Sequence, residues 1–269
     1  MGDRLKQLKI YFIKFLRLFV KTGGWKAFIF AGVISLLLAM VVDDNMFVYG
    51  LDTESGCFSV ISACIWIGIF NSIQVICKER DIIKREHRSG MHISSYILAR
   101  ALYEFIICFF QAIIMLIICL IFYTFPEKGL VTGNIVIDIF ITFFLVFLSS
   151  DYLGIAVSSI VKTITTAMTV MPFILIVQLI FSGVLFSLEG NMALIAKITI
   201  SKWGMEALGT ISNMDGLPYN EVGWTIIPRD AYIYESGHVI RSWLIILGFA
   251  ILYLFIGIVS LKFVDKDKR

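Results

Sequence analysis

The sequence is poor in charge and in the residues that build soluble active sites. Charged residues make up 16% of the 269 positions, three histidines occur without a metal-binding spacing, and the five cysteines show no C-x-x-C pair. The cysteines are therefore interpreted as small apolar fillers, not metal ligands. The G-x-S-x-G and H-E-x-x-H patterns are also absent, and no nucleophile, base and oxyanion donor are expected to converge. The sequence gives no support to an enzyme.

Nucleotide-binding and secretion signals are also missing. The G-x-x-x-x-G-K-[ST] loop, which cradles nucleotide phosphates, does not occur. Residues 1–21 are basic and amphipathic throughout, without a small-residue cleavage pattern, so we expect no cleavable signal peptide.

What the chain has in excess is apolar sequence. Its hydrophobic content is 59% and its mean hydropathy is +0.89, whereas soluble domains are about 45–50% apolar. A helix crosses a bilayer with about 20 apolar residues. The sequence therefore predicts an all-α polytopic membrane protein with both termini on one side. Its six predicted transmembrane helices are 25–42, 57–77, 97–123, 135–157, 167–186 and 243–263.

The first 23 residues precede these spans and have a different pattern. Leu5 and Phe12 follow the spacing of one helical face, while basic side chains such as Lys14 and Arg17 occupy the other. A basic amphipathic helix of this kind lies in the plane of the lipid head groups. The open alternative is a positively charged anchor that only flanks the first span.

Lysine and arginine are distributed unevenly between the two sides. Of the 23 basic residues, 18 lie in segments on the same side as the termini. Because cytoplasmic loops carry the excess of these residues, both termini and the charged stretch at 78–96 are predicted to be cytoplasmic.

Residues 78–96 are the most polar stretch between two apolar runs. Glu79, Asp81 and Glu86 are interleaved with basic residues, and the composition suits a helix. The rule of positive cytoplasmic loops explains the basic residues but not the acidic ones. We interpret the stretch as a short helix that a soluble partner contacts, because mixed charges set docking register and partner choice. The alternative is a solvated loop.

Residues 187–241 form a segment too long for a simple connection. The part from Met192 to Leu208 remains half apolar, which predicts short helices that re-enter the membrane against protein. A folded cap on the outer face is an equally open interpretation. Among polar residues inside the apolar runs, Asp151 is costly to bury. Pairing with another helix is favoured for it over a place in a cavity.

Two groups of residues carry a resemblance to a known family. Glu79-Arg80, Glu86, Gly90 and Ser95-Tyr96 follow the pattern E-R-x5-E-x3-G-x4-S-Y, and Ile180 to Leu188 is followed by the Ile200-Ser201-Lys202-Trp203-Gly204 run. The order of these two motifs along the chain, together with the six predicted spans, resembles the membrane domain of the White/pigment-type (G subfamily) ABC exporters, a type-2 exporter architecture. The resemblance covers nearly the whole chain. The likeness is to bacterial forms, in which this domain is often fused behind an ATPase.

The resemblance implies a single transmembrane domain that acts as the permease of an ATP-driven exporter. A separate ATP-binding cassette subunit would bind ATP and Mg, and this chain would bind no cofactor. A second permease, either a second copy or a close paralogue, would complete the transporter in a bacterial cytoplasmic membrane. A nucleic-acid partner is not expected. The cargo class stays open between lipid-like molecules, other amphipathic molecules and peptides.

The resemblance also implies roles for individual residues. Residues 1–23, with Lys14 and Arg17, would be a connecting helix. The outer valve would be Val184 and Leu185. Phe70, Asn71 and Ser72 would line the transport cavity, although core packing is an equally open role for them. Contact with the ATPase is assigned to Glu79, Arg80, Lys84, Arg85, Glu86 and Gly90.

Two other functions stay open on the sequence alone. A relay or assembly subunit would use the same fold to transmit ATPase motion without moving cargo. A membrane enzyme acting on lipids would need carboxylates or histidines gathered near one interface, and Asp151 is alone in its part of the predicted span.

Overall fold

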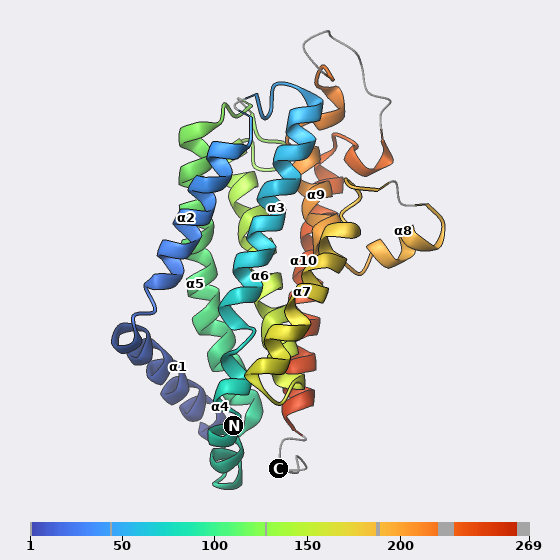
Figure 1. Ribbon diagram of the computed structural model, residues 1–269. Coiled ribbons are helices and arrows are strands. Elements are labelled where there is room, and N and C mark those ends of the chain that lie inside the picture. Colours follow the sequence, from blue (N-terminus) through green and yellow to red (C-terminus); the bar gives the residue numbers. More distant parts are fainter. Residues whose placement is uncertain (1, 44, 127, 187–188, 220–228, 263–269) are drawn as a thin grey trace.

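The computed structural model describes residues 2–43, 45–126, 128–186, 189–219 and 229–262, and every regular element within them is helical. Helices dominate because a helix satisfies its own backbone hydrogen bonds, as an apolar segment in lipid requires. Figure 1 shows the long helices running side by side. The start of α1 (Gly2–Thr22) and the end of α10 (Ser236–Leu261) lie at the same end of the molecule.

Two helices form the centre of the bundle, α3 (Gly50–Ser72) and α6 (Ile135–Ile160). In their most apolar stretches 67% of the residues are buried, against 39% for α5 (Ile93–Phe122) and 22% for α10. The remaining apolar side chains of α5 and α10 face outward, where lipid is an equally apolar environment.

Glycine allows α3 and α6 to approach closely. A Cβ at Gly68 would lie 2.8 Å from the backbone oxygen of Phe147, and one at Gly154 would lie 3.0 Å from that of Ile69. The hydroxyl of Ser72 also donates to the backbone oxygen of Asp151 at 2.5 Å. The centre is therefore a tight contact between small residues, as is common between membrane helices.

The amphipathic helix predicted at the N-terminus is present as α1. It meets α2 (Lys26–Val41) at a bend of 68°. Gly23 sits in this bend with φ +71°, a conformation that strains any residue with a side chain. Beyond the bend, α2 packs on α5 and exposes apolar side chains such as Phe30 and Leu37.

The charged stretch predicted as one helical segment, 78–96, consists of three parts. Helix α4 (Val75–Arg88) begins two residues after α3 and already includes the end of the predicted span 57–77. A turn at residues 89–92 follows, with Gly90 at φ +99°. Helix α5 then starts at Ile93, four residues before the predicted span 97–123.

The opposite end of the molecule is built mainly from the segment after α7 (Ile164–Ile180). It contains the short helices α8 (Asn191–Ala196) and α9 (Ile200–Ile211) and the 3-10 turns η1 (Met214–Gly216) and η2 (Asp230–Tyr232). Nearly all of α9 is buried, against α10, α6 and α3. Residues 187–188 and 220–228 of the predicted outer segment lie outside the described residues.

The all-helical, multi-span prediction is confirmed, whereas the count of six spans stays a prediction. In the described part of the chain, four helical stretches are long and apolar enough to cross a membrane: Gly50–Arg88, α5, α6 and α10. The bent pair of α1 and α2 makes a fifth candidate. Helix α7 is apolar but has 17 residues and stops six short of the predicted end at 186. Helix α10 starts seven residues before its predicted span 243–263.

Candidate functional site

Two glutamates of α4 are held by tyrosines of neighbouring helices. The hydroxyl of Tyr11 in α1 donates to Oε2 of Glu86 at 2.9 Å, and the hydroxyl of Tyr96 in α5 donates to Oε2 of Glu79 at 2.9 Å. The Nζ atom of Lys14 lies 4.0 Å from Glu79 and 3.8 Å from Glu86. One cation of α1 therefore faces both carboxylates of α4. Partial burial and the hydrogen bond to Glu86 raise the pKa of Tyr11 above its ordinary value, so its hydroxyl stays a donor.

Gln7 of α1 fixes the turn that follows α4. Its Nε2 donates to the backbone oxygen of Gly90 at 3.1 Å, and its Oε1 accepts from the backbone N–H of His92 at 2.9 Å. The hydroxyl of Ser95 donates to the backbone oxygen of Arg4 at 3.1 Å. A small cavity of about 440 Å³ remains between α1 and the end of α4. The start of α1 is thus tied to the α4–α5 turn.

The start of α4 is bonded to the end of α6. Arg80 donates from Nη1 to the backbone oxygens of Ser159, at 2.9 Å, and Val161, at 3.1 Å. The hydroxyl of Ser158 accepts from the backbone N–H groups of Ile76 and Cys77, at 3.0 and 3.1 Å. Carbonyls left free at a helix C-terminus favour a cation, and Arg80 occupies that place for α6.

A buried apolar cluster lies beneath these polar contacts. It includes Phe15 of α1, Ile76 and Ile83 of α4, and Tyr96 and Ile97 of α5, all at most 1% exposed. Phe15 packs edge-on against Tyr96, with 5.6 Å between ring centroids. Truncating a buried phenylalanine costs about 3–5 kcal/mol. Helices α1, α4, α5 and α6 therefore form one packed unit at this end of the molecule.

One face of α4 stays open to solvent. From Lys78, exposed residues recur after three or four positions, as one side of a helix requires. They are Lys78, then Asp81 and Ile82, then Arg85, and then Arg88 and Ser89 at the helix end. Ile82 is 39% exposed although it is flanked by charged residues. We name residues 78, 81, 82, 85 and 89 the α4 face. It combines both signs of charge with one apolar side chain, which suits a protein-binding surface.

The residues predicted to contact an ATPase are divided by this geometry. Arg85 lies on the α4 face, and Gly90 is exposed in the turn beside it. Glu86 bonds to Tyr11 of α1, and Glu79 bonds to Tyr96 of α5. Arg80 points to α6, and Lys84 is half-buried. Lys14 lies between the two glutamates, whereas no contact of Arg17 brings it into this cluster within the described residues.

Sequence reasoning missed several residues of this region. Gln7 and Tyr11 hold α4 in place but carry no formal charge, so the charge pattern did not single them out, and Tyr96 was named in the family motif without this role. Ile82 and Asp81 belong to the α4 face. The three-to-four residue spacing from Lys78 was the signal that could have identified them.

A groove of about 660 Å³ lies between the bend of α1–α2 and the inner half of α3. Phe70 and Asn71, two of the predicted lining residues, line it together with Trp66 and Phe30. The rings of Trp66 and Phe70 stack with their centroids 6.3 Å apart. Ser72, the third predicted lining residue, does not line this groove, because its fully buried side chain points to α6. The groove is mainly apolar, with one amide at its end.

The side chain of Asn71 is held by a partner from α5. Its Nδ2 donates to Oε1 of Gln111 at 2.7 Å, and Nε2 of Gln111 donates back to Oδ1 of Asn71 at 3.2 Å. Gln111 also donates to the backbone oxygen of Ala27 in α2 at 3.3 Å. The amide pair therefore joins α2, α3 and α5 at the groove.

A second polar cluster lies inside the bundle. Arg100 and Glu104 of α5 form a buried ion pair of 2.5 Å, and the guanidinium of Arg100 lies over the rings of Phe15, at 5.1 Å, and Tyr103, at 4.8 Å. Asp151 of α6 is fully buried, and its carboxylate oxygens accept no hydrogen bond from the described residues. Its charge interacts with that of Arg100 in α5, the kind of pairing that was favoured, and its backbone oxygen accepts from the hydroxyl of Ser72.

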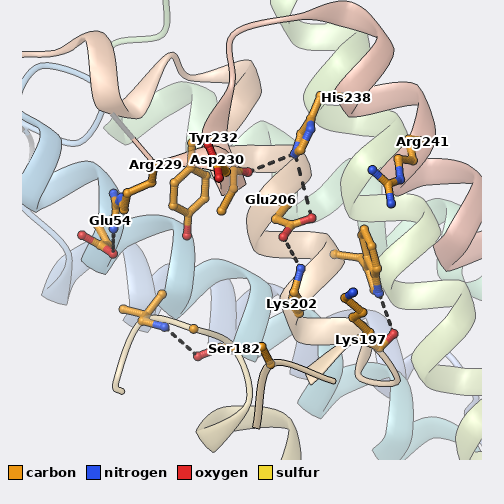
Figure 2. Close-up of a pocket in the computed structure, with 15 residues that line it drawn as sticks. Glu54, Ser182, Lys197, Lys202, Glu206, Arg229, Asp230, Tyr232, His238 and Arg241 are labelled. Carbon is orange, nitrogen blue, oxygen red and sulfur yellow. Dashed lines mark hydrogen bonds and ion pairs between the residues drawn. The ribbon is translucent and has the colours of Figure 1, made fainter. Parts of the chain in front are cut away.

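The predicted valve residues lie after α7, at the outer end. Gly183 and Val184 line a pocket of about 590 Å³, drawn in Figure 2, whereas Leu185 is 51% exposed. Gly183 has φ +87°, which a residue with a side chain rarely adopts. Within the described residues no cluster of His, Cys, Asp or Glu is able to hold a metal, and all five cysteines are buried and unpaired.

The fold and this site define a multi-span helical membrane protein with a polar helix presented at one end. Residues 7–211 match the family model described as ABC-2 type transporter, and the chain belongs to this family. Its members are the membrane components, not the ATPases, of ABC transporters, so the protein is such a permease component in a membrane.

One relative is similar in sequence, the ABC transporter ATP-binding/permease protein Rv1747 of Mycobacterium tuberculosis (strain ATCC 25618 / H37Rv). It is 24% identical over 182 residues, which are 66% of this chain. The match spans 20% of the length of that relative.

Proposed function

We propose that this chain is the permease of an ATP-driven exporter of the White/pigment-type (G subfamily), in the bacterial form whose ATPase is a separate subunit. That subunit binds ATP and Mg, and this chain binds neither. The observation that carries the proposal is the α4 face, which is exposed on a helix held from behind by α1, α5 and α6. Family membership supports it.

The α4 helix is the element through which ATPase motion enters the membrane domain. A partner that docks on Ile82 and on the flanking charges pushes a helix that cannot yield alone, because Tyr11, Tyr96 and Arg80 bind it to three other helices. Displacement of α4 therefore moves α1 and the inner end of α6 with it. Mixed charges on the face give register and partner choice more than affinity.

Cargo enters at the apolar groove beside Trp66 and Phe70. Its position next to the bend of α1–α2 makes it accessible from the inner leaflet when α1 lies along the membrane surface. Mainly apolar walls with one amide, Asn71, and one cation, Lys26, suit a lipid-like or amphipathic cargo, or a hydrophobic peptide. Trp66 and Phe70 are 44% and 50% exposed. A second permease, identical or paralogous, closes the groove into a cavity whose outer limit is formed by Val184 and Leu185.

The chain lies in the cytoplasmic membrane of a bacterium with both termini in the cytoplasm. The supporting observation is the concentration of lysine and arginine at the end formed by α1 and α4. Exposed apolar side chains of α1, including Leu5, Ile10 and Val20, then lie against lipid while its basic residues meet the head groups.

The test is binding of the ATPase subunit to α4. Arg85→Glu and Ile82→Asp change the α4 face without touching its contacts to α1 and α6. Each is expected to reduce co-purification of the ATPase about tenfold, since a buried interface charge or apolar anchor is worth about 1–3 kcal/mol. Lys21→Glu is the matched control, because Lys21 is exposed on the far end of α1.

Normal ATPase binding by both α4 variants would contradict the proposal. ATPase binding and stimulation without movement of any lipid or peptide would instead favour a relay subunit that moves no cargo.

A further inference from the structure

The outer pocket of Figure 2 contains several charges that neutralise each other. Arg229 donates to Oε1 of Glu54 at 2.6 Å and to Oδ1 of Asp215 at 2.8 Å. Burial alone would lower the pKa of Arg229, but the hydrogen bonds to Asp215 and Glu54 raise it above its ordinary value. Lys202 pairs with Glu206 one helical turn along α9. These pairs fix two of the four cations that line the pocket, beside the carboxylates of Glu54, Glu206 and Asp230.

Two cations on the other side of the pocket are not balanced. Within the described residues, Lys197 and Arg241 make no ion pair, and both are exposed. The indole of Trp203 lies beside them, and Nζ of Lys202 also lies over this ring, 4.4 Å from its centroid. The guanidinium of Arg241 lies 5.9 Å from the ring centroid of Trp203. The indole Nε1 of Trp203 donates to the backbone oxygen of Lys197 at 2.8 Å. Figure 2 shows Lys197 and Arg241 on the same side, away from Arg229 and Glu54.

An apolar surface adjoins this cationic side. Ala193 of α8 lines the pocket, and the residues around it are exposed although apolar. Met192, Leu194 and Ile198 are 53%, 60% and 66% exposed. In a membrane protein such a surface lies against acyl chains. Lysine and tryptophan next to it are the residue types that occupy the head-group level.

We propose that this pocket binds an anionic amphiphile of the outer leaflet. Its phosphate or carboxylate head group lies between Lys197 and Arg241 beside Trp203, and its acyl chain covers α8. A soluble phosphate offers the same head-group chemistry but leaves the apolar side chains of α8 uncovered, so a lipid is the better fit. The site needs neither α4 nor an ATPase, but its assignment to the outer leaflet rests on the membrane orientation given with the proposed function.

The test uses the fluorescence of a tryptophan introduced on α8 by Leu194→Trp, taken as the difference between this variant and the purified full chain. Leu194 is 60% exposed where the acyl chain is placed, whereas Trp203 is 6% exposed. The probes are phosphatidylglycerol and phosphatidylcholine with the same brominated acyl chains, which quench tryptophan on contact. Phosphatidylglycerol is expected to quench at about tenfold lower concentration, the preference that one charge-assisted contact provides. The double change Lys197→Gln with Arg241→Gln is expected to abolish this preference.

Two controls separate charge from folding. Lys197→Arg with Arg241→Lys keeps both charges and is expected to keep the preference. Lys128→Gln removes an exposed cation from the same end of the molecule and is expected to change nothing.

Equal quenching by the two lipids, or an unchanged preference in the double glutamine variant, would overturn the proposal. Displacement of brominated phosphatidylglycerol by inorganic phosphate alone would identify a soluble anion as the ligand and contradict the lipid assignment.

Discussion

Removing Glu86 is expected to loosen α4 from α1 without harming the surface that binds the ATPase. A hydrogen bond to a charged group is worth about 1.5–3 kcal/mol when it is buried. Because the Glu86 side chain is 33% exposed, we take about 1 kcal/mol for its bond with Tyr11 and about 0.5 kcal/mol for the pair with Lys14. Their joint loss of about 1.5 kcal/mol corresponds to roughly a tenfold larger population with α4 detached.

The assay is a distance measurement between spin labels on α1 and on the turn after α4. Val20→Cys and His92→Cys introduce thiols for the labels at two exposed positions outside the α4 face, whereas the five native cysteines are buried. Bound to its ATPase, the wild-type permease is expected to give one narrow distance distribution with and without ATP. Glu86→Ala is expected to broaden it and to lower export per ATP hydrolysed, while ATPase binding persists.

In the permease without its ATPase, Asp81→Ala is the matched control, since it removes the same charge from the same helix but from the exposed face. It is expected to leave the distance distribution narrow. A Glu86→Ala permease with a narrow distribution and normal export would refute the role given to the α1–α4 contact.

Three further predictions concern other parts of the chain. Gly68→Ala is expected to lower the free energy of unfolding by about 1–3 kcal/mol, seen in thermal unfolding, because the new Cβ would clash with α6. Gly248→Ala is the control, because a Cβ at Gly248 would meet open space. Asn71→Leu leaves Gln111 with only its bond to Ala27 and is expected to lower the free energy of unfolding by about 1–3 kcal/mol, measured as a lower melting temperature, with normal stability contradicting the paired geometry. Arg229→Gln leaves two outer carboxylates without their cation, and faster hydrogen exchange at η2 is expected, with α4 unaffected.

The general class of fold could be predicted because membrane solvation leaves few choices. An apolar run of about 20 residues becomes a helix wherever water is absent, and α5 and α6 lie close to their predicted positions. Helix ends were less predictable. The start of α3 at Gly50 and the start of α10 at Ser236 lie in polar sequence, where tertiary contacts decide whether a helix continues.

The candidate site was predicted in location but not in detail. The charges of residues 78–96 predicted a polar helix between two apolar runs, yet charge alone does not show which way each side chain points. Only packing turned Glu79 and Glu86 towards α1 and α5 and left Arg85 with Ile82 on the open face. Likewise Ser72 follows directly on Asn71, but a helix turns by about 100° per residue, so the two side chains face different neighbours.

By itself, then, the sequence determined that this is a helical membrane protein with a basic amphipathic start and a charged helix between two crossings. Hydropathy and charge are local properties, and each segment carries its own. The tertiary structure alone decided which side chains meet. The clamp of Gln7 on Gly90, the amide pair of Asn71 with Gln111, and the gathering of Lys197 and Arg241 around Trp203 join residues 40 or more positions apart or on separate helices. Such contacts depend on how helices pack, which no local pattern specifies.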